Sequence, residues 1–311
     1  MGKFCIKILI LGIIMSIAGT VILAVEALNG FIDEIPSLPI DSHNHAVSGE
    51  YAVTTMLETS DVVDQVTYTF HDVYETARKA NVSPEEIQEL DISISMGSFD
   101  IIPGDSFMLY ANGIDENYLE FAVNDGCLDV KYSPDINLFD LEWLSASPDI
   151  MLYVPIKTYD KVNIDMSAGT LSVSEISAQD FVLDISAGNA YLTAINAFNS
   201  SDIKMSAGDA VFSHCIFENS NNINMSMGSM IFEECSITGQ SDIKVSAGDL
   251  QMYLSGSSEY YDISANKSAG SLYINDKEVN TYNVDSASDN PNGTINVKVS
   301  AGSCYIVFDE D

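Results

Sequence analysis

Apolar and polar residues alternate in short runs along most of the chain beyond residue 90, and the runs meet at a recurring Ser-(Ala/Met)-Gly tripeptide. Before most of the glycines, apolar residues stand five and three places back with a polar residue between them, which is the period-two pattern of a half-buried strand. After the glycine the apolar places become plus two and plus four, so the inward phase slips by one residue. A bulge or corner produces such a slip, and glycine tolerates the positive φ that a corner requires.

The tripeptide therefore marks structural corners, and the interval between them predicts the fold. Successive corners from Gly169 to Gly248 are 19, 20, 20 and 20 residues apart. A second slip follows, since the next apolar column is plus seven, so each coil should contain about three short strands. One such coil cannot bury its apolar side alone, so neighbouring coils must stack, about 4.8 Å apart, with like residues in ladders. The corner residues are Gly97, Gly169, Gly188, Gly208, Gly228, Gly248, Gly270 and Gly302.

The predicted fold is thus all-β, a β-solenoid of about 20-residue coils over residues 91–311. Two gaps are longer: 22 residues before Gly270, read as a two-residue bulge after "YYDIS", and 32 before Gly302, where "SASDNPNG" predicts an external loop. Residues 105–155 look like an irregular first layer, with hairpins at Asn112-Gly113 and Asp125-Gly126 and a strand over 149–155.

Residues 31–90 read as a spacer with short strands and one short helix. In "NVSPEEIQEL", Ser83 is a good helix cap, Pro84 suits the first helical position, and Glu86 would close a capping box.

Residues 1–30 predict a cytoplasmic tail and a membrane anchor. Residues 8–25 carry no charge and are long enough to cross a bilayer. Lys3 and Lys7 precede this segment and acids follow it, so the positive-inside rule places the body outside the cytoplasm. A cleaved signal peptide is the alternative, because Val25 and Ala27 are small residues at the positions that signal peptidase prefers. Either way, the sequence predicts export, and the anchor predicts a single-pass cell-membrane protein.

Charge narrows the classes of partner. The chain has 46 acidic and 12 basic residues among 311, a formal net charge of −34, and a single arginine, Arg78. A basic surface that follows a phosphate backbone cannot be built from so few cations, so nucleic acid is not an expected partner, nor are anionic sugars.

Candidate chemistry is sparse, and we expect no catalytic residues, cofactor or metal. The serine of the tripeptide falls on an outward position in every copy and no histidine recurs beside it, so we expect its hydroxyl to satisfy backbone groups at the bend. Asp41, His43 and His45 in "DSHNH" could begin a metal site but lie in the spacer. Asp- and Asn-rich bends leave weak calcium binding open.

The cysteines offer one pairing. Cys215 and Cys235 share the plus-seven column of successive coils, within reach of a disulfide. We favour two small apolar side chains in an interior ladder, and the disulfide stays open. No Cys or His spacing predicts zinc.

Several of these elements occur in a familiar order: "LDISISMGSFDI", a hairpin ending in "VNDGCLDVKY", the strand "IMLYVP", and then "VNIDMSAGTLSV", "VLDISAGNAYL" and "IKMSAGDAVF". Over residues 90–308 the chain resembles the putative-adhesin β-strand-repeat family of bacterial envelopes. The resemblance implies a right-handed, all-β, solenoid-like domain behind one membrane span, with adhesion as the suggested role. It implies no catalytic residues.

The leading hypothesis is a membrane-anchored, non-enzymatic module that binds an envelope or cell-surface protein or glycan in adhesion. An accessory sensor in envelope-stress signalling is the alternative. A β-helix enzyme acting on polysaccharides is the third hypothesis, but such enzymes need a groove lined with lysine or arginine, and the only arginine precedes the coils.

Overall fold

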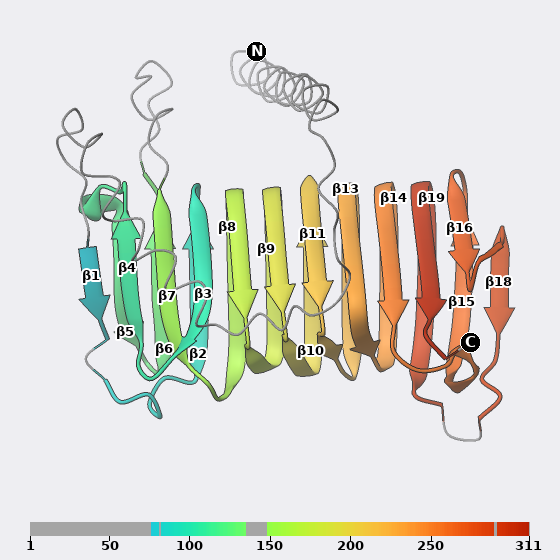
Figure 1. Ribbon diagram of the computed structural model, residues 1–311, viewed down its shortest axis with the longest axis horizontal. Coiled ribbons are helices and arrows are strands. Elements are labelled where there is room, and N and C mark those ends of the chain that lie inside the picture. The colour runs from blue at the N-terminus through green and yellow to red at the C-terminus, as the bar shows by residue number, and fades with distance from the viewer. Residues whose placement is uncertain (1–75, 81, 135–147, 289–290, 311) are drawn as a thin grey trace, which may run out of the picture. The chain divides into compact units, whose positions relative to one another are not determined.

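Short strands, hydrogen-bonded side by side in stacked coils, make up the structure (Figure 1). The computed structural model describes residues 76–80, 82–134, 148–288 and 291–310, all within one of two compact units, Phe70–Asp311. The other unit, Met1–Thr69, lies outside the described residues, and so do the predicted anchor at residues 8–25 and the "DSHNH" segment. Within the described ranges, no helix has the length and apolar character needed to cross a membrane.

The N-terminal strands are β1 (Thr76–Lys79), β2 (Glu89–Ile94), β3 (Ser98–Gly104), β4 (Met108–Asn112), β5 (Leu119–Asn124), β6 (Cys127–Tyr132) and β7 (Asp149–Pro155). The central strands are β8 (Thr158–Ser174), β9 (Ser177–Thr193), β10 (Asn196–Met205), β11 (Gly208–Ser213), β12 (Ile216–Phe217), β13 (Ser220–Ile237) and β14 (Gly239–Leu254). The C-terminal strands are β15 (Tyr261–Lys267), β16 (Ser271–Ile274), β17 (Lys277–Glu278), β18 (Thr281–Val284) and β19 (Gly293–Phe308). Two short 3-10 helices, η3 (Glu116–Tyr118) and η5 (Ser258–Tyr260), precede β5 and β15.

Each coil contains three short strands, as the double phase slip predicts. The coil that begins at Gly208 consists of β11, then β12, then the first part of β13. Between them the backbone turns at His214 and Asn219, with φ of 55° and 64°. The second corner recurs six residues after Gly169, Gly188 and Gly228, where Glu175, Ala194 and Glu234 also have φ near 55°. These left-handed residues account for the second slip in the hydrophobic pattern.

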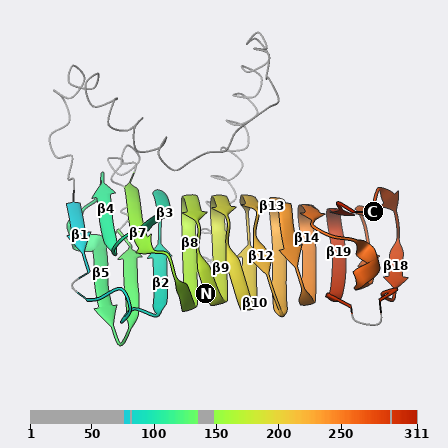
Figure 2. The ribbon, with the colours of Figure 1, turned by 60° about the horizontal axis from the view of Figure 1, so that its bottom comes forward.

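The coils stack in parallel and in register. Ile203 lies opposite Ile223, and Phe212 lies opposite Phe232 with their rings stacked at 4.6 Å between centroids. The apolar columns predicted from the sequence are buried throughout the central coils, and the all-β, solenoid-like fold is confirmed. The row of strands can be followed from β1 to β18 in Figure 2.

The order of the coils in space differs from their order in the chain. β14 pairs along its whole length with β19, so that Gly248 lies opposite Gly302, and β19 pairs in turn with β15 and β16. The last coil of the chain is therefore inserted between the Gly248 and Gly270 coils (Figure 1). The segment between β16 and β19 contains β17 and β18, which pair with β16 and β15, and these additional strands account for the long gap before Gly302.

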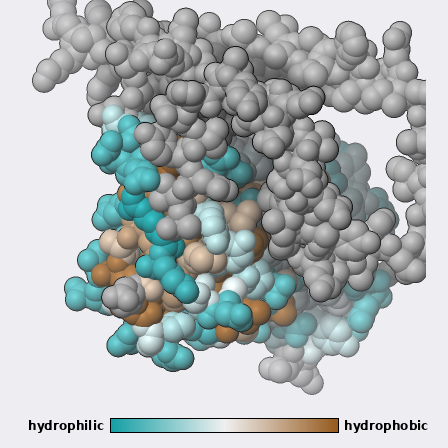
Figure 3. All heavy atoms as spheres, turned by 60° about the vertical axis from the view of Figure 1, so that its left-hand side comes forward, coloured by the Kyte–Doolittle hydropathy of each residue, from teal (hydrophilic) through white to brown (hydrophobic). Residues whose placement is uncertain are grey.

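The N-terminal end has a similar construction. β2 lies between β6 and β8, and β3 lies between β7 and β8, so the chain leaves the Gly97 coil, builds the layer beyond it, and returns. Antiparallel strands flank both ends: β4 on β7 and β1 on β4 at one, β18 on β15 at the other. Such strands cover sheet edges that would otherwise offer free backbone groups. Figure 3 looks onto the N-terminal end, where apolar patches lie between hydrophilic ones.

Three local predictions are wrong. The helix expected at Ser83 is a single turn. The Ser83 backbone N–H donates to the Glu86 carboxylate, but the Glu86 N–H donates to the Ser83 carbonyl and not to its hydroxyl, so only half of the capping box forms. The backbone N–H groups of Gln88 and Glu89 already donate to the Gly126 carbonyl and draw the chain into β2. The Asn112-Gly113 hairpin does not form, because β4 pairs with β1 and β7 and not with β5.

The bulge expected after "YYDIS" is also absent, since β15 keeps unbroken register with β19 from Tyr261 onward. The extra residues lie before Tyr261, around η5. Two other local predictions are confirmed, the Asp125-Gly126 hairpin between β5 and β6 and the strand ending at Pro155.

One feature of the interior is polar. Ser201, Asn221 and Ser241 occupy a single buried column in successive coils. The Asn221 side chain accepts from Ser201 Oγ and donates to Ser241 Oγ and to the Thr238 carbonyl, so its buried amide is satisfied.

Candidate functional site

The corner glycines form a column in which backbone lies directly on backbone. Seven of the eight have φ between 87° and 140°, and Gly248 is the exception. A Cβ built on Gly208 would lie 1.8 Å from the Gly188 carbonyl oxygen, and the same clash recurs along the column. The close approach of successive coils, together with positive φ, therefore requires glycine at this corner. The role of this column is structural.

The serines of the tripeptide point outward, as predicted. They are exposed in seven coils and half-buried at Ser95. Within the described residues, none of their hydroxyls makes a hydrogen bond to the protein, so the expected satisfaction of backbone groups at the bend is not seen.

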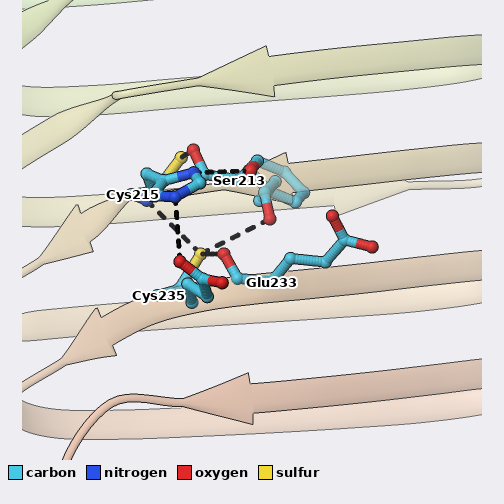
Figure 4. A network of polar contacts seen from close by, with 7 residues as sticks. Ser213, Cys215, Glu233 and Cys235 are labelled. Atoms are coloured by element: carbon cyan, nitrogen blue, oxygen red, sulfur yellow. Dashed lines mark hydrogen bonds and ion pairs between the residues drawn. The ribbon is translucent and has the colours of Figure 1, made fainter. Parts of the chain in front are cut away.

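A second group of polar contacts lies at the plus-six corner, around Ser213, Cys215, Glu233 and Cys235 (Figure 4). Ser213 Oγ is 2.8 Å from His214 Nδ1, and His214 Nε2 is 2.9 Å from Glu234 Oε2. The sequence did not predict this Ser–His–acid contact. The side chains of His214 and Glu234 are 63% and 74% exposed, so water competes for both contacts. A proton relay needs a drier and more rigid environment than this corner provides.

Cys215 and Cys235 lie beneath that corner in the interior. Both are fully buried free thiols, so the favoured interpretation, an interior ladder without a disulfide, is the one the structure contains. The Cys215 backbone N–H donates to Cys235 Sγ over 3.4 Å, and Cys235 Sγ donates to the Phe212 and Glu233 carbonyls. The side-chain interaction with the Cys215 thiol, reinforced by burial, raises the pKa of Cys235, although the Cys215 backbone N–H opposes this shift. This thiol stays protonated and has no nucleophilic character.

In the part of the chain that the structure describes, no group of three or more His, Cys, Asp or Glu side chains is arranged to hold a metal ion.

The most distinctive surface lies on the strands that follow each corner glycine, here called the post-glycine face. It comprises β3, β11 and β16 and the corresponding parts of β8, β9, β13, β14 and β19. Its outward residues at plus three include Tyr191, which is 51% exposed, followed in successive coils by Val211, Ile231 and Gln251. Tyr191 is thus exposed and Val211 and Ile231 are half-buried on the outward side of three consecutive coils, and the polar Gln251 follows them.

Three tyrosines lie beside Gln251 at the C-terminal end of this face: Tyr253 at plus five, and Tyr305 and Tyr273 at plus three of the next two coils. We call Tyr253, Tyr273 and Tyr305 the tyrosine surface. Tyr305 lies directly between Gln251 and Tyr273 in the register, and its ring is 6.1 Å from Tyr253 and 5.9 Å from Tyr273 between centroids. The rings belong to three coils that are neighbours only because β19 is inserted. Reading the repeat in chain order would separate Tyr253 from Tyr305, which is why the sequence did not reveal the cluster.

Comparison with known proteins assigns the family. The model of the Toastrack DUF4097 family matches residues 87–304, and the chain belongs to this family. The family resemblance noted from the sequence is confirmed. No curated protein matches the chain.

Several solved structures are similar at low identity. A putative cell adhesion protein from Clostridium sporogenes is 13% identical, covers 76% of this chain and 100% of its own, and has a TM-score of 0.34. A putative adhesin from Bacteroides fragilis is 11% identical over 77% of this chain and 98% of its own, with a TM-score of 0.37. A putative lipid binding protein from Parabacteroides distasonis is 14% identical over 75% and 96%, with a TM-score of 0.28.

The glycine column generates a stability prediction. Gly208→Ala should lower the free energy of unfolding by about 3 kcal/mol or more, because backbone strain and a clash with the neighbouring backbone add. Gly256→Ala is the matched control: its φ is also positive, at 99°, but no atom lies within 4 Å of the added Cβ, so only strain of about 1 kcal/mol is expected. Urea unfolding followed by circular dichroism measures both. Equal losses would show that close backbone stacking is not the constraint.

The cysteines generate a reactivity prediction. Burial, with smaller contributions from Asp129, Asp91 and Glu89, raises the pKa of Cys127 to about 11, and burial raises that of Cys304 to about 12. Alkylation of Cys127 in the native protein should accelerate about tenfold per pH unit between pH 8 and 10, because the thiolate is the nucleophile. Cys215, Cys235 and Cys304 should stay unmodified until the protein unfolds. Mass spectrometry resolves each site, and rapid labelling of Cys215 at pH 8 would contradict its interior placement.

Proposed function

We propose that the protein is a non-enzymatic surface-interaction module of the adhesion type. The observation that supports this most is the post-glycine face, where the exposed Tyr191 and the half-buried Val211 and Ile231 lie on the outward side of three successive coils. Exposed rows of this kind, bordered by polar residues, are typical of protein interaction surfaces. The rigid ladder beneath them presents the side chains at a fixed spacing of about 4.8 Å, which favours an extended partner.

The proposal includes anchorage to the membrane, with the Toastrack domain outside the cytoplasm. The uncharged segment at residues 8–25 and the lysines before it support this orientation. The finer points of the family resemblance, a right-handed winding and a single membrane-spanning helix, belong to the same proposal. Nucleic acid is not among the partners, because the net charge of −34 repels it.

Surface display of the full chain in a non-adherent bacterium tests the function. Cells that express it should bind to a surface coated with bacterial envelope extract at least fivefold more than cells without it. Replacing Tyr191, Val211 and Ile231 by serine on the post-glycine face should abolish the difference.

The matched control replaces Asp184, Asn224 and Lys244 by serine, three outward residues on the strands that precede the glycine, and should leave binding intact. Equal binding by both triple variants would contradict a role for the post-glycine face. Turnover of an envelope polysaccharide by the purified full chain would overturn the non-enzymatic proposal.

A further inference from the structure

The tyrosine surface forms the floor and walls of an open hollow of about 430 Å³. Asp249, Leu250, Gln251 and Ser303 complete its lining beside the three rings. The volume is in the range of small-ligand sites and would also receive one or two long side chains of a partner. Tyrosine suits such a place, because its ring offers a large contact area and its conformational freedom is small.

Tyr305 is held in place at the centre of the hollow. Its hydroxyl donates to Asp276 Oδ1, and this hydrogen bond, followed by desolvation and the charge of Asp276, raises the pKa of Tyr305. The phenol therefore stays neutral and the ring stays oriented between Tyr253 and Tyr273. A ring fixed before binding loses little entropy when a ligand arrives.

The charged residues at the outward positions of the post-glycine face are all acidic. None of the outward positions of the post-glycine face, at plus one, plus three and plus five in the coils, holds lysine or arginine, whereas Asp209, Glu233 and Asp249 are among them. Lys204, Lys244 and Lys298 all lie on the strands that precede the glycine.

The lysine closest to the tyrosine surface in sequence lies on the opposite side of its sheet. Lys277 on β17 pairs with the buried Ile274, and cross-strand partners point the same way, so Lys277 does not share the outward side of Tyr273.

We propose that the tyrosine surface binds the guanidinium and ammonium groups of a basic polypeptide segment. This inference rests on the proposed function and names its partner class. Cations are attracted to the faces of aromatic rings within about 6 Å, and arginine also stacks flat on them. Asp249 supplies a carboxylate at the rim of the hollow, and the acidic face steers a basic partner toward it.

The alternative ligand classes fit less well. An anionic ligand would meet carboxylates, and Lys267, the lysine beside the cross-strand partner of Tyr273, is already paired with Glu278 over 2.8 Å. A neutral sugar could stack on the same rings, but it would gain nothing from the exclusion of lysine and arginine from the surrounding columns. The combination of rings and one-signed charge therefore favours a cation.

Fluorescence polarisation with the full chain in mild detergent tests the proposal. The probe is a labelled peptide of glycine and serine with four arginines, measured at physiological ionic strength so that distant charges are screened. The same peptide with citrulline in place of arginine keeps the shape and removes the charge. We expect saturable binding of the arginine peptide, and binding of the citrulline peptide at least tenfold weaker.

Variants distinguish binding at the tyrosine surface from non-specific attraction to an acidic protein. Tyr305→Leu should weaken binding of the arginine peptide at least fivefold, whereas Tyr305→Phe, which keeps the ring and loses only the hydrogen bond to Asp276, should weaken it by about twofold or less. Tyr110→Leu, which removes an exposed aromatic ring on β4 outside the post-glycine face, is the control for the ring. Asp249→Asn should weaken binding about threefold or more, and Glu120→Gln, an exposed acid on β5 with the same change in charge, should have no effect.

Each contrary outcome has a definite meaning. Equal losses of affinity for the arginine peptide in Asp249→Asn and Glu120→Gln would show that binding depends only on the net charge of the protein, and would overturn the tyrosine surface as the site. Equal binding of the arginine and citrulline peptides would show that the surface does not recognise positive charge, and would overturn the proposal. Binding of a neutral oligosaccharide such as cellohexaose, lost in Tyr305→Leu, would reassign the surface to glycans. Failure of the arginine peptide while displayed cells still adhere would overturn this inference and leave the proposed function standing.

Discussion

Direct contact between the backbones of successive coils at the corner glycines is the constraint on which this structure depends. Gly169, Gly188, Gly208 and Gly228 leave no room for a Cβ beside the carbonyl of the coil before. The stack can close to the spacing of hydrogen-bonded strands only if every coil turns at the same place. Register then follows along the whole coil, because a slip of one residue would turn the buried columns outward. The in-register aromatic and aliphatic ladders are a consequence of that corner.

The same constraint allows the order of the coils in the stack to differ from their order in the chain. A coil with a glycine corner and the same apolar columns fits against any other, so β19 can occupy the space between β14 and β15 although the chain builds β15 first. The insertion places the C-terminal strand in the interior of the stack and brings Tyr305 between Tyr253 and Tyr273. The surface that we propose for a basic partner therefore depends on the order of coils as well as on the residues within them.

The sequence predicted what is local and repeated. Ile203, Met205 and Phe212 stand in columns whose period determines which side is buried, so the spacing of apolar residues was enough to assign those columns to the interior. The order of the last two coils could not be assigned in this way, because nothing in a single coil specifies its neighbour. The capping signals at Ser83 were present but lost to strand pairing, and Asn112-Gly113 lies between strands that pair elsewhere. The tyrosine surface was missed for the same reason as the coil order, since its rings come together only through the insertion.

Cysteine cross-linking tests the stacking order most directly. Ala247 lies opposite Ala301 in the register, about 4.8 Å away, whereas Ala269 is two coils from Ala247, about 9.6 Å. All three are exposed at the corner. Under mild oxidation, the double variant Ala247→Cys/Ala301→Cys should form a disulfide-linked peptide detected by mass spectrometry, and Ala247→Cys/Ala269→Cys should not. Efficient linkage of the second pair and none of the first would mean that the coils stack in chain order, and the inserted coil and the tyrosine surface would both be wrong.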